Sequence, residues 1–414
     1  MKNRVVITGI GVISPNGVGA ESFAAACRDG KSGISALQNI NTEKLRSSVA
    51  GQVLNFDPLT VMDAAESRRV PRMVHLALAA SREALAHANI TLAPDDLTHQ
   101  RQIGVALGTG GGGLAFVEEQ YRAFFLENKG SLFSITGGTH GNLSSELSIA
   151  LHLRGPSHVL STGCTSSTDA LGYAMHLIRA GISPMMLAGG ADAPIAEGIL
   201  TAFEKMRVIS TRRWENPAQA SRPFSIDRDG FVLGEGAWMF ILEERGHALA
   251  RGAAILAELA GYASTCDAFH RVQIAPDVVE PVRAMELALA DANLSREDIG
   301  YINLHGTGTE LNDRMETAAV KKCFGTRAGS IPMSSTKSMI GHPQGACGAA
   351  GLAATILSLR GGFLHPTINL DRPDPHCDLD YIPNLARKAA ARAALCNCIA
   401  FGSKNSALVV QVDV

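Results

Sequence analysis

Leu160-Ser-Thr-Gly-Cys-Thr-Ser-Ser-Thr-Asp169 is the stretch of this sequence that says most about the fold. A short apolar run ends at Leu160, small residues follow, and apolar side chains then recur at helical spacing from Ala170 to Ile178. This order predicts a strand, a tight turn and a helix, with Cys164 at the turn. Unpaired backbone N–H groups and the helix dipole favour an anion there, and for cysteine the anion is the nucleophilic thiolate.

Two interpretations of Cys164 are open from this stretch alone. The layout resembles the nucleophile elbow of hydrolases, with Cys in place of Ser and without the flanking G-x-S-x-G pattern. The alternative is a buried small hydrophobe, since free cysteine is among the most buried residue types. Two histidine segments, described below, favour the nucleophile.

Length and composition limit the class of protein. With 414 residues, 46% of them hydrophobic, the chain can bury a large core, and two closely packed halves are expected. The net charge of −2 comes from 37 basic and 39 acidic residues, so no nucleic-acid or membrane partner is expected. The strand-like N-terminus does not resemble a signal peptide. The eight cysteines include no C-x-x-C pair, which argues against a disulfide framework or zinc site and favours the reducing cytoplasm.

Strand-like and helical patterns alternate along the chain. The predicted strands are Val5–Ile13, Ile103–Leu107, His158–Leu160, Met185–Ala188, Trp238–Leu242, Ile255–Tyr262 and Ile299–Leu304, followed by a closing hairpin of Cys396–Phe401 and Ala407–Val412. The predicted helices include Val74–Ala88, Ala170–Ala180 and Val282–Ala292. Such alternation predicts α/β layers with a mostly parallel sheet. Because residues 1–250 and 251–414 have a similar order of elements, we expect a duplicated fold.

Two features have ordinary structural explanations. Gly108–Gly113 lacks the Lys-Ser/Thr ending of a P-loop and the acidic residue of a dinucleotide site, so we interpret it as a tight turn under a binding pocket. Cys396 and Cys398 share one face of a predicted strand, and we interpret them as core residues.

Two further segments carry histidines on glycine-bracketed turns. In Ile302–Asp313, His305 follows an apolar strand, and Met333–Gly348 contains His342. A lone histidine beside glycines is more often structural, but two of them together with the Cys164 turn favour catalytic groups. Loops at the carboxyl ends of strands are where α/β sheets place their chemistry.

Together these motifs resemble the β-ketoacyl-acyl carrier protein synthases of the elongating type, in the thiolase superfamily. The matching segments cover essentially the whole chain and are Val5–Gly11, Gly155–Ser157, the Cys164 turn, Asp227–Ala237, His305–Thr309, Ser335–His342, Cys377–Pro383 and Phe401–Asn405. The resemblance implies a thiolase-like, duplicated α-β-α-β-α architecture of five layers. Residues 312–322 and 371–381 are more similar to the ketosynthase (alpha) subunits of type II polyketide synthases than to fatty-acid enzymes.

The resemblance also implies a decarboxylative Claisen condensation in fatty acid or polyketide elongation. Cys164 would hold an acyl group as a thioester, and malonyl-acyl carrier protein would lose CO₂ and attack it, giving 3-ketoacyl-acyl carrier protein. Neutral imidazoles of His305 and His342 would donate N–H to the enolate oxygen. This chemistry requires no metal and no other cofactor, and none is expected.

Further residues take supporting roles by the same resemblance. Lys337 would organise the site electrostatically near the acidic Asp313 and Glu316. The backbone N–H groups of Cys164 and Phe401 would form the oxyanion hole, and the Phe401 side chain would act as a gate.

Two positions depart from the family pattern. Gly351 stands where a glutamate is frequent, which puts in doubt a charge or ion site that would involve Asn303. Phe401-Gly-Ser-Lys-Asn405 replaces the usual Phe-Gly-Gly-Thr-Asn, and it is expected to bring the charge of Lys404 into the gating loop.

Three other functions share part of this pattern of residues. A thiolase has a histidine motif similar to Gly341–Ala346 and a second catalytic cysteine near the C-terminus, but it lacks a histidine in the context of His305. A non-catalytic chain-length factor would have lost Cys164. A hydrolase would need a base held against the cysteine by Asp or Asn.

The implied partners are acyl carrier protein, in acyl and malonyl forms, and a second subunit, either another copy of this chain or a chain-length-factor-like protein. Carrier proteins of this pathway are acidic by family, so Arg68, Arg69 and Arg72 form a candidate docking patch. A solvated charged turn is an equal alternative. Arg68 and Arg72 would share a face only if the segment were helical, and Pro71 intervenes.

Overall fold

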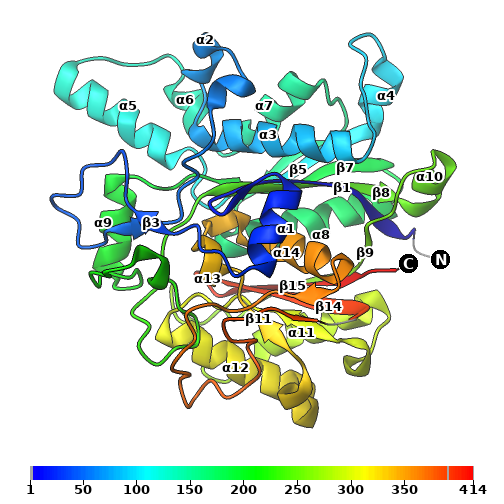
Figure 1. The fold of residues 1–414 in the computed structure, drawn as a ribbon. Helices are drawn as coiled ribbons and strands as arrows, with labels where there is room; N and C mark the ends of the chain where they lie inside the picture. The colour runs from blue at the N-terminus through cyan, green and yellow to red at the C-terminus, as the bar shows by residue number, and fades with distance from the viewer. Residues whose placement is uncertain (1–2, 389–390, 414) are drawn as a thin grey trace.

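The computed structural model describes residues 3–388 and 391–413. Its helices and strands lie in five layers, in the order helix, sheet, helix, sheet, helix (Figure 1). The five-layer α/β architecture implied by the resemblance is therefore confirmed. Within the described ranges, every helix is too short or too polar to cross a bilayer.

The two sheet layers have the same internal plan. The first contains the five strands β1 (Val5–Ser14), β5 (Ile103–Gly108), β6 (Ser157–Leu160), β7 (Met185–Asp192) and β8 (Gly236–Glu244), in the order β1-β8-β7-β5-β6. The second contains β9 (Ala257–Cys266), β10 (Tyr301–Asn303), β11 (Met333–Ser334), β14 (Ala393–Ala400) and β15 (Lys404–Gln411), in the order β9-β15-β14-β10-β11. Corresponding neighbours run in the same relative directions in both halves.

The expectation of a mostly parallel sheet was wrong. In each half two strand pairs are parallel and two are antiparallel. In the second half the cause is the short turn between β14 and β15, because a connection of three residues can join only antiparallel neighbours. β1 also pairs antiparallel with β9, which joins the two halves and the short β2 (Gly17–Val18) into one 11-stranded sheet.

Helices cover both outer faces and fill the middle. α3 (Arg72–His87) and α7 (Asn142–Leu151) pack on the first sheet, and α11 (Val279–Ala292) and α12 (Glu310–Phe324) on the second. Between the sheets lie α1 (Ala20–Arg28), α8 (Ser166–Arg179) and α14 (Cys347–Arg360), in a core that includes Phe23, Trp238 and Tyr301. The central layer matters most for the site, because α8 and α14 both begin next to Cys164.

The remaining α-helices and strands of the described chain are α2 (Ala64–Ser67), α4 (Leu97–Gln102), α5 (Leu114–Glu127), α6 (Ser134–Gly138), α9 (Glu197–Met206), α10 (Arg245–Ala250), α13 (Lys337–Ile340), β3 (Ser35–Ala36), β4 (Val49–Ala50), β12 (Phe363–Leu364) and β13 (Arg387–Lys388). Each predicted strand and helix overlaps an element of the predicted type, with ends that differ by up to four residues.

Candidate active site

The predicted strand, turn and helix around Cys164 are confirmed. β6 ends at Leu160, a 3₁₀ turn spans Gly163–Thr165, and α8 begins at Ser166. Gly163 has a φ of 74°, a conformation that residues with a Cβ rarely adopt, so the turn depends on glycine at this position. The Cys164 side chain lies buried at this turn, before the first residue of α8.

His305 is held in place by a buried carboxylate. It lies two residues beyond β10, where its backbone N–H donates to Glu316 at 2.8 Å and that of Gly306 donates to the same carboxylate at 2.7 Å. Glu316 belongs to α12 and also accepts a hydrogen bond from Asn397 Nδ2 of β14 at 2.7 Å. The turn that carries His305 is thereby tied to one helix and one strand.

His342 is held by its backbone and its ring. Its N–H donates to the carbonyl of Val232 at 2.7 Å, and its carbonyl accepts from the N–H of Gly234 at 3.0 Å. The backbone N–H of Gln344 donates to His342 Nδ1 at 3.1 Å. An Nδ1 that accepts a hydrogen bond carries no proton in the neutral ring, so the proton of neutral His342 is assigned to Nε2.

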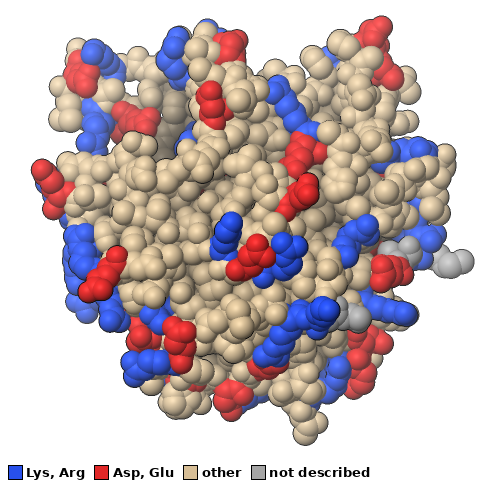
Figure 2. Space-filling view, in the orientation of Figure 1, with Lys and Arg blue, Asp and Glu red and all other residues tan. Residues whose placement is uncertain are grey.

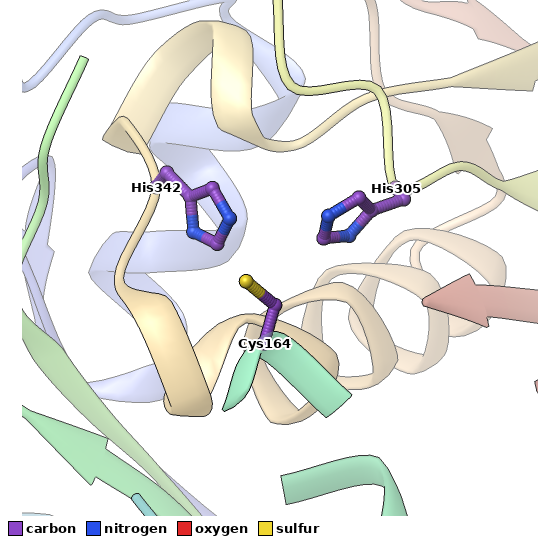
Figure 3. A group of neighbouring side chains, drawn as sticks. All are labelled: Cys164, His305 and His342. Carbon is purple, nitrogen blue, oxygen red and sulfur yellow. The ribbon is translucent and has the colours of Figure 1, made fainter. Parts of the chain in front are cut away.

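Cys164, His305 and His342 face a common space (Figure 3). The sulfur and one nitrogen from each ring lie within 4.8 Å of one another, and the ring centroids are 5.3 Å apart. All three residues line a cavity of about 360 Å³. This volume lies near the lower end of the range for pockets that bind small ligands, about 300–1,000 Å³.

Burial dominates the protonation of these groups. It lowers the pKa of both imidazoles well below the ordinary value of 6.5, and the charge of Lys337 lowers both further. Burial raises the pKa of the Cys164 thiol by more than Lys337 and the N–H of Phe401 lower it. The helix N-terminus alone had suggested a low thiol pKa, but desolvation of the thiolate opposes that effect. The resting site therefore contains a thiol and two neutral imidazoles.

The predicted supporting residues Lys337, Asp313 and Glu316 are all buried. Asp313 accepts backbone hydrogen bonds from Thr307 at 3.1 Å and Phe224 at 2.8 Å, and its carboxylate lies 3.2 Å from the Arg228 guanidinium. Burial raises the pKa of Asp313, and the charge of Arg228 and the hydrogen bond from Phe224 oppose the rise. Burial also raises the pKa of Glu316, opposed by the hydrogen bonds from Gly306 and His305. Both carboxylates hold the His305–Gly308 turn, whereas Lys337 acts on the imidazoles through its charge.

Phe401 lies in the turn between β14 and β15, one residue after the strand in which it was predicted. Its half-buried side chain lines the cavity beside Ile399 and Ala400, and its backbone N–H hydrogen-bonds Cys164. Lys404 was expected in the gating loop, but it is the first residue of β15, where it pairs with Cys266.

Gly351 leaves no room for the glutamate that is frequent at this position. A Cβ atom on Gly351 would lie 2.5 Å from Asn303 Oδ1, so the asparagine occupies that space. Asn303 Nδ2 donates to Thr336 Oγ1 at 3.0 Å and lies 3.1 Å from His365 Nε2. Neutral groups thus surround Asn303 on this side of the site.

In the described part of the chain, two sets of side chains have the spacing that a metal ion requires. One is Cys164 with His305 and His342, and the other is His305 with Cys347 and Cys398. Their soft sulfur and imidazole ligands would suit zinc or copper rather than magnesium. His305 is common to both groups, so an ion in either would compete with the acyl chemistry proposed below.

The three arginines of the candidate docking patch have different environments. Arg68 is exposed just after α2, Arg69 forms an ion pair with Glu66, and Arg72 begins α3. The Arg72 guanidinium makes two hydrogen bonds of 2.9 Å to Glu235. Arg68 and Arg72 do not share one helix. On the face shown in Figure 2, basic and acidic side chains are mixed rather than segregated.

Several residues near the site were missed from sequence. Thr307, Thr309 and Arg207 line the cavity, and the two threonines belong to the His305 motif already recognised. Cys347 and Cys398 lie against the Cys164 backbone. Their spacing along the chain gave no signal of this, because only the tertiary fold brings α14 and β14 together.

Comparison with known proteins agrees with this geometry. Family models match residues 2–248 (beta-ketoacyl synthase, N-terminal domain) and 256–371 (beta-ketoacyl synthase, C-terminal domain). The chain is 39% identical to 3-oxoacyl-[acyl-carrier-protein] synthase 2 of Synechocystis sp., covering 99% of this chain and 98% of that protein. It is 38% identical to putative polyketide beta-ketoacyl synthase 1 of Streptomyces halstedii, with the same coverage.

Solved structures agree over the full length. One is a type II polyketide acyl carrier protein in complex with its ketosynthase, with a TM-score of 0.91, 34% identity and 100% coverage of both chains. Another is the ishigamide ketosynthase/chain length factor, with a TM-score of 0.91, 33% identity and 100% coverage of both chains. By sequence, fold and site geometry together, the chain belongs to the beta-ketoacyl synthase family.

Proposed function

We propose that this condensing enzyme joins a Cys164-bound acyl group to malonyl-acyl carrier protein, giving 3-ketoacyl-acyl carrier protein and CO₂. The observation that carries the proposal is the convergence of one cysteine and two neutral imidazoles on a single cavity. A thiol supplies the covalent acyl carrier, and two neutral N–H donors suit an enolate oxygen.

Two chemical steps follow from these residues. In loading, Cys164 Sγ attacks the acyl thioester, the bond from the acyl carbon to the donor sulfur breaks, and the thiol proton passes to that sulfur, so the donor leaves as a free thiol. In condensation, malonyl loses CO₂ to give an enolate whose oxygen is held by His305 and His342. The enolate carbon then attacks the acyl-cysteine carbonyl, the C–S bond breaks, and the cysteine leaves as a thiolate that takes up a proton to restore the thiol. Backbone N–H groups of Cys164 and Phe401 stabilise the oxyanion in each acyl transfer.

The supporting residues have proposed roles as well. Glu316 and Asp313 position the turn of His305, and Lys337 keeps both imidazoles neutral through its charge. Phe401 acts as the gate, since its half-buried side chain lines the cavity next to a glycine.

The proposed partners are acyl carrier protein and a second ketosynthase-type subunit. The polyketide ketosynthase structure contains its carrier protein, and the ishigamide structure is a ketosynthase with a chain length factor. On this chain, large apolar side chains are exposed on and around α5 and α6: Tyr121, Phe124, Phe125, Leu126, Leu132 and Ile135. An apolar surface of this kind favours a subunit interface. Retention of Cys164 makes this chain the catalytic member of either a homodimer or a heterodimer.

Residues 1–250 and 251–414 are proposed as the two halves of the duplicated fold, the first carrying Cys164 and the second both histidines. Cytoplasmic location is also a proposal, supported by eight free cysteines.

A thiolase-type condensation is less well supported. It would need a second cysteine facing substrate, and in the described chain that part of the cavity wall is formed by Ile399, Ala400 and Phe401 rather than by Cys398.

Three variants test the proposal by intact mass spectrometry and CO₂ release. Cys164→Ala should abolish condensation, while decarboxylation of malonyl-acyl carrier protein persists. His305→Ala and His342→Ala should each lower decarboxylation on the order of 10²–10³-fold. Each single histidine variant should still load Cys164, because the thiol proton passes to the leaving donor sulfur rather than to an imidazole. Near-normal 3-ketoacyl product from Cys164→Ala would contradict the nucleophile assignment, and equal damage to both steps in the histidine variants would contradict their roles.

A further inference from the structure

Two buried cysteines pack directly against the backbone of Cys164. Cys347 is the first residue of α14, and Cys398 lies in β14. Each sulfur is 3.1 Å from the carbonyl oxygen of Cys164, and the two sulfurs are 3.6 Å apart. Both side chains are almost fully buried, so water does not compete for these contacts.

Cys398 also contacts a proposed catalytic ring. Its Sγ lies 3.5 Å from His305 Nδ1, within hydrogen-bond range for sulfur. With Nδ1 turned toward Cys398, the other ring nitrogen is left to face the cavity, and Figure 3 shows one nitrogen of His305 directed toward His342. That nitrogen can donate to an enolate oxygen only if the proton of the neutral ring is on it.

The available hydrogens decide which bonds can coexist. A thiol has one hydrogen to donate, so Cys398 can donate either to the Cys164 carbonyl or to His305 Nδ1. Cys347 alone can satisfy the Cys164 carbonyl. If Cys398 donates to Nδ1, every group in the cluster is satisfied, and the imidazole proton lies on Nε2. If Cys398 donates to the carbonyl instead, its sulfur can accept from the Cys347 thiol at 3.6 Å or from His305. His305 Nδ1 then has a hydrogen-bond partner only if it carries the imidazole proton itself, and Nε2 loses its donor.

We propose that Cys398 is a positioning residue that donates its S–H to Nδ1 of His305 and so holds the Nε2–H form needed in decarboxylation. In this arrangement the S–H of Cys347 donates to the carbonyl oxygen of Cys164. His342 offers a parallel, because its Nδ1 also receives a donor, the backbone N–H of Gln344. The inference rests on the proposed function, since it assigns the donor tautomer of one of its two histidines.

The test compares Cys398→Ala, Cys398→Val and Cys398→Ser. Alanine removes the donor, valine removes it while filling the space, and serine keeps a hydroxyl that can donate to Nδ1. Cys396→Ala is the matched control, because Cys396 is buried on the same face of the same strand but contacts Thr355. We expect Cys398→Ala and Cys398→Val to lower decarboxylation of malonyl-acyl carrier protein on the order of 3–10-fold, as for loss of one neutral hydrogen bond. Cys164 loading, the serine variant and the control should stay within about twofold of the unmodified chain.

A second readout separates tautomer from packing. In protein labelled with ¹⁵N-histidine, the His305 ring signals can be assigned by their loss in His305→Asn. The unmodified chain and Cys398→Ser should show the proton on Nε2, and Cys398→Ala should show a larger Nδ1–H fraction. Unchanged ring signals and decarboxylation in Cys398→Ala, or a serine variant as impaired as alanine, would overturn the inference. Failure of the unmodified chain to decarboxylate malonyl-acyl carrier protein would instead overturn the proposed function.

Discussion

At the scale of single residues, the protonation of the site follows from burial and one nearby cation. Burial disfavours charge on Cys164, His305 and His342 alike, and the positive charge of Lys337 further disfavours imidazolium. In the proposed reaction, a neutral imidazole with its proton on Nε2 donates that N–H to the enolate oxygen during decarboxylation. The sequence singled out all three residues that the structure brings together at the cavity, but the direction of the thiol pKa depends on tertiary burial that no local motif encodes.

The protonation of His305 and His342 should reflect these lowered imidazole pKa values. The charged fraction of a ring grows only when pH drops through its pKa. Because that pKa lies well below 6.5 in both histidines, both rings should stay neutral as pH falls through the ordinary histidine range. In Lys337→Met the imidazole pKa values should rise, so both rings should become charged at higher pH. The ¹⁵N shifts of the labelled histidine rings measure this as pH is lowered, with Lys321→Met as the control. Superimposable titrations in the Lys337 and control variants would contradict this effect of Lys337.

At the scale of elements, the spacing of apolar residues in the sequence predicted the strands around the site better than the helices. α12 has many polar residues, so it shows no clear apolar stripe. α14 is buried on almost every side between the sheets, so its apolar residues are not confined to one face. The β14–β15 hairpin was predicted, but its turn was placed too late. The apolar run of Ile399 and Ala400 continues into Phe401, and only the strand register shows that pairing ends at Ala400 and Lys404.

The link between α12 and the His305 turn can be tested with Glu316→Gln. The carboxylate accepts hydrogen bonds from His305, Gly306 and Asn397 and a longer one of 3.5 Å from Asn312, whereas an amide would turn its NH₂ group toward at least one of these donors. We expect a loss of about 1–3 kcal/mol in unfolding free energy and a larger fall in decarboxylation than in Cys164 loading. Urea unfolding and separate assays of the two steps measure this. Glu286→Gln on the exposed face of α11 is the control, and equal loss of both steps in Glu316→Gln would indicate general destabilisation only.

Phe401→Ala tests the turn between β14 and β15. Complete burial would predict a loss of about 3–5 kcal/mol, but this side chain is only half-buried at the cavity wall. We therefore expect melting close to that of the unmodified chain, with more CO₂ released per 3-ketoacyl product, because a gate couples decarboxylation to prior acylation. Thermal melting and the ratio of CO₂ to 3-ketoacyl product distinguish a gate from a structural residue. A large drop in melting temperature with an unchanged ratio would leave Phe401 a structural residue.

At the scale of the whole molecule, the duplicated plan explains why residues from distant parts of the chain meet. Cys164 belongs to the first half of the fold, whereas His305 and His342 belong to the second half. The two halves meet through the β1–β9 ladder and the central helices, which brings these turns to one cavity. Sequence could predict two similar halves from their order of elements. It could not predict the mixed strand directions, since those depend on which strands become neighbours.

Carrier-protein docking is the remaining prediction at this scale, and the structure sharpens the choice of variant. Arg72 is bound to buried Glu235, so its reversal would leave a buried carboxylate without its partner and confound the result. Arg68 is exposed, and Arg68→Glu changes the surface charge without that penalty.

An acidic carrier protein should bind the Arg68→Glu variant more weakly, because the approach of two charged surfaces is steered by their mutual potential. We expect KM for acyl-acyl carrier protein to rise several-fold at low salt and to converge with that of the unmodified chain at high salt, where the charges are screened. KM for a short acyl-pantetheine thioester should not change. Arg283→Glu on α11, at an exposed ion pair with Glu280, serves as the control charge reversal. A rise in KM of the same size for both substrate forms, or for both variants, would remove Arg68 from the docking surface.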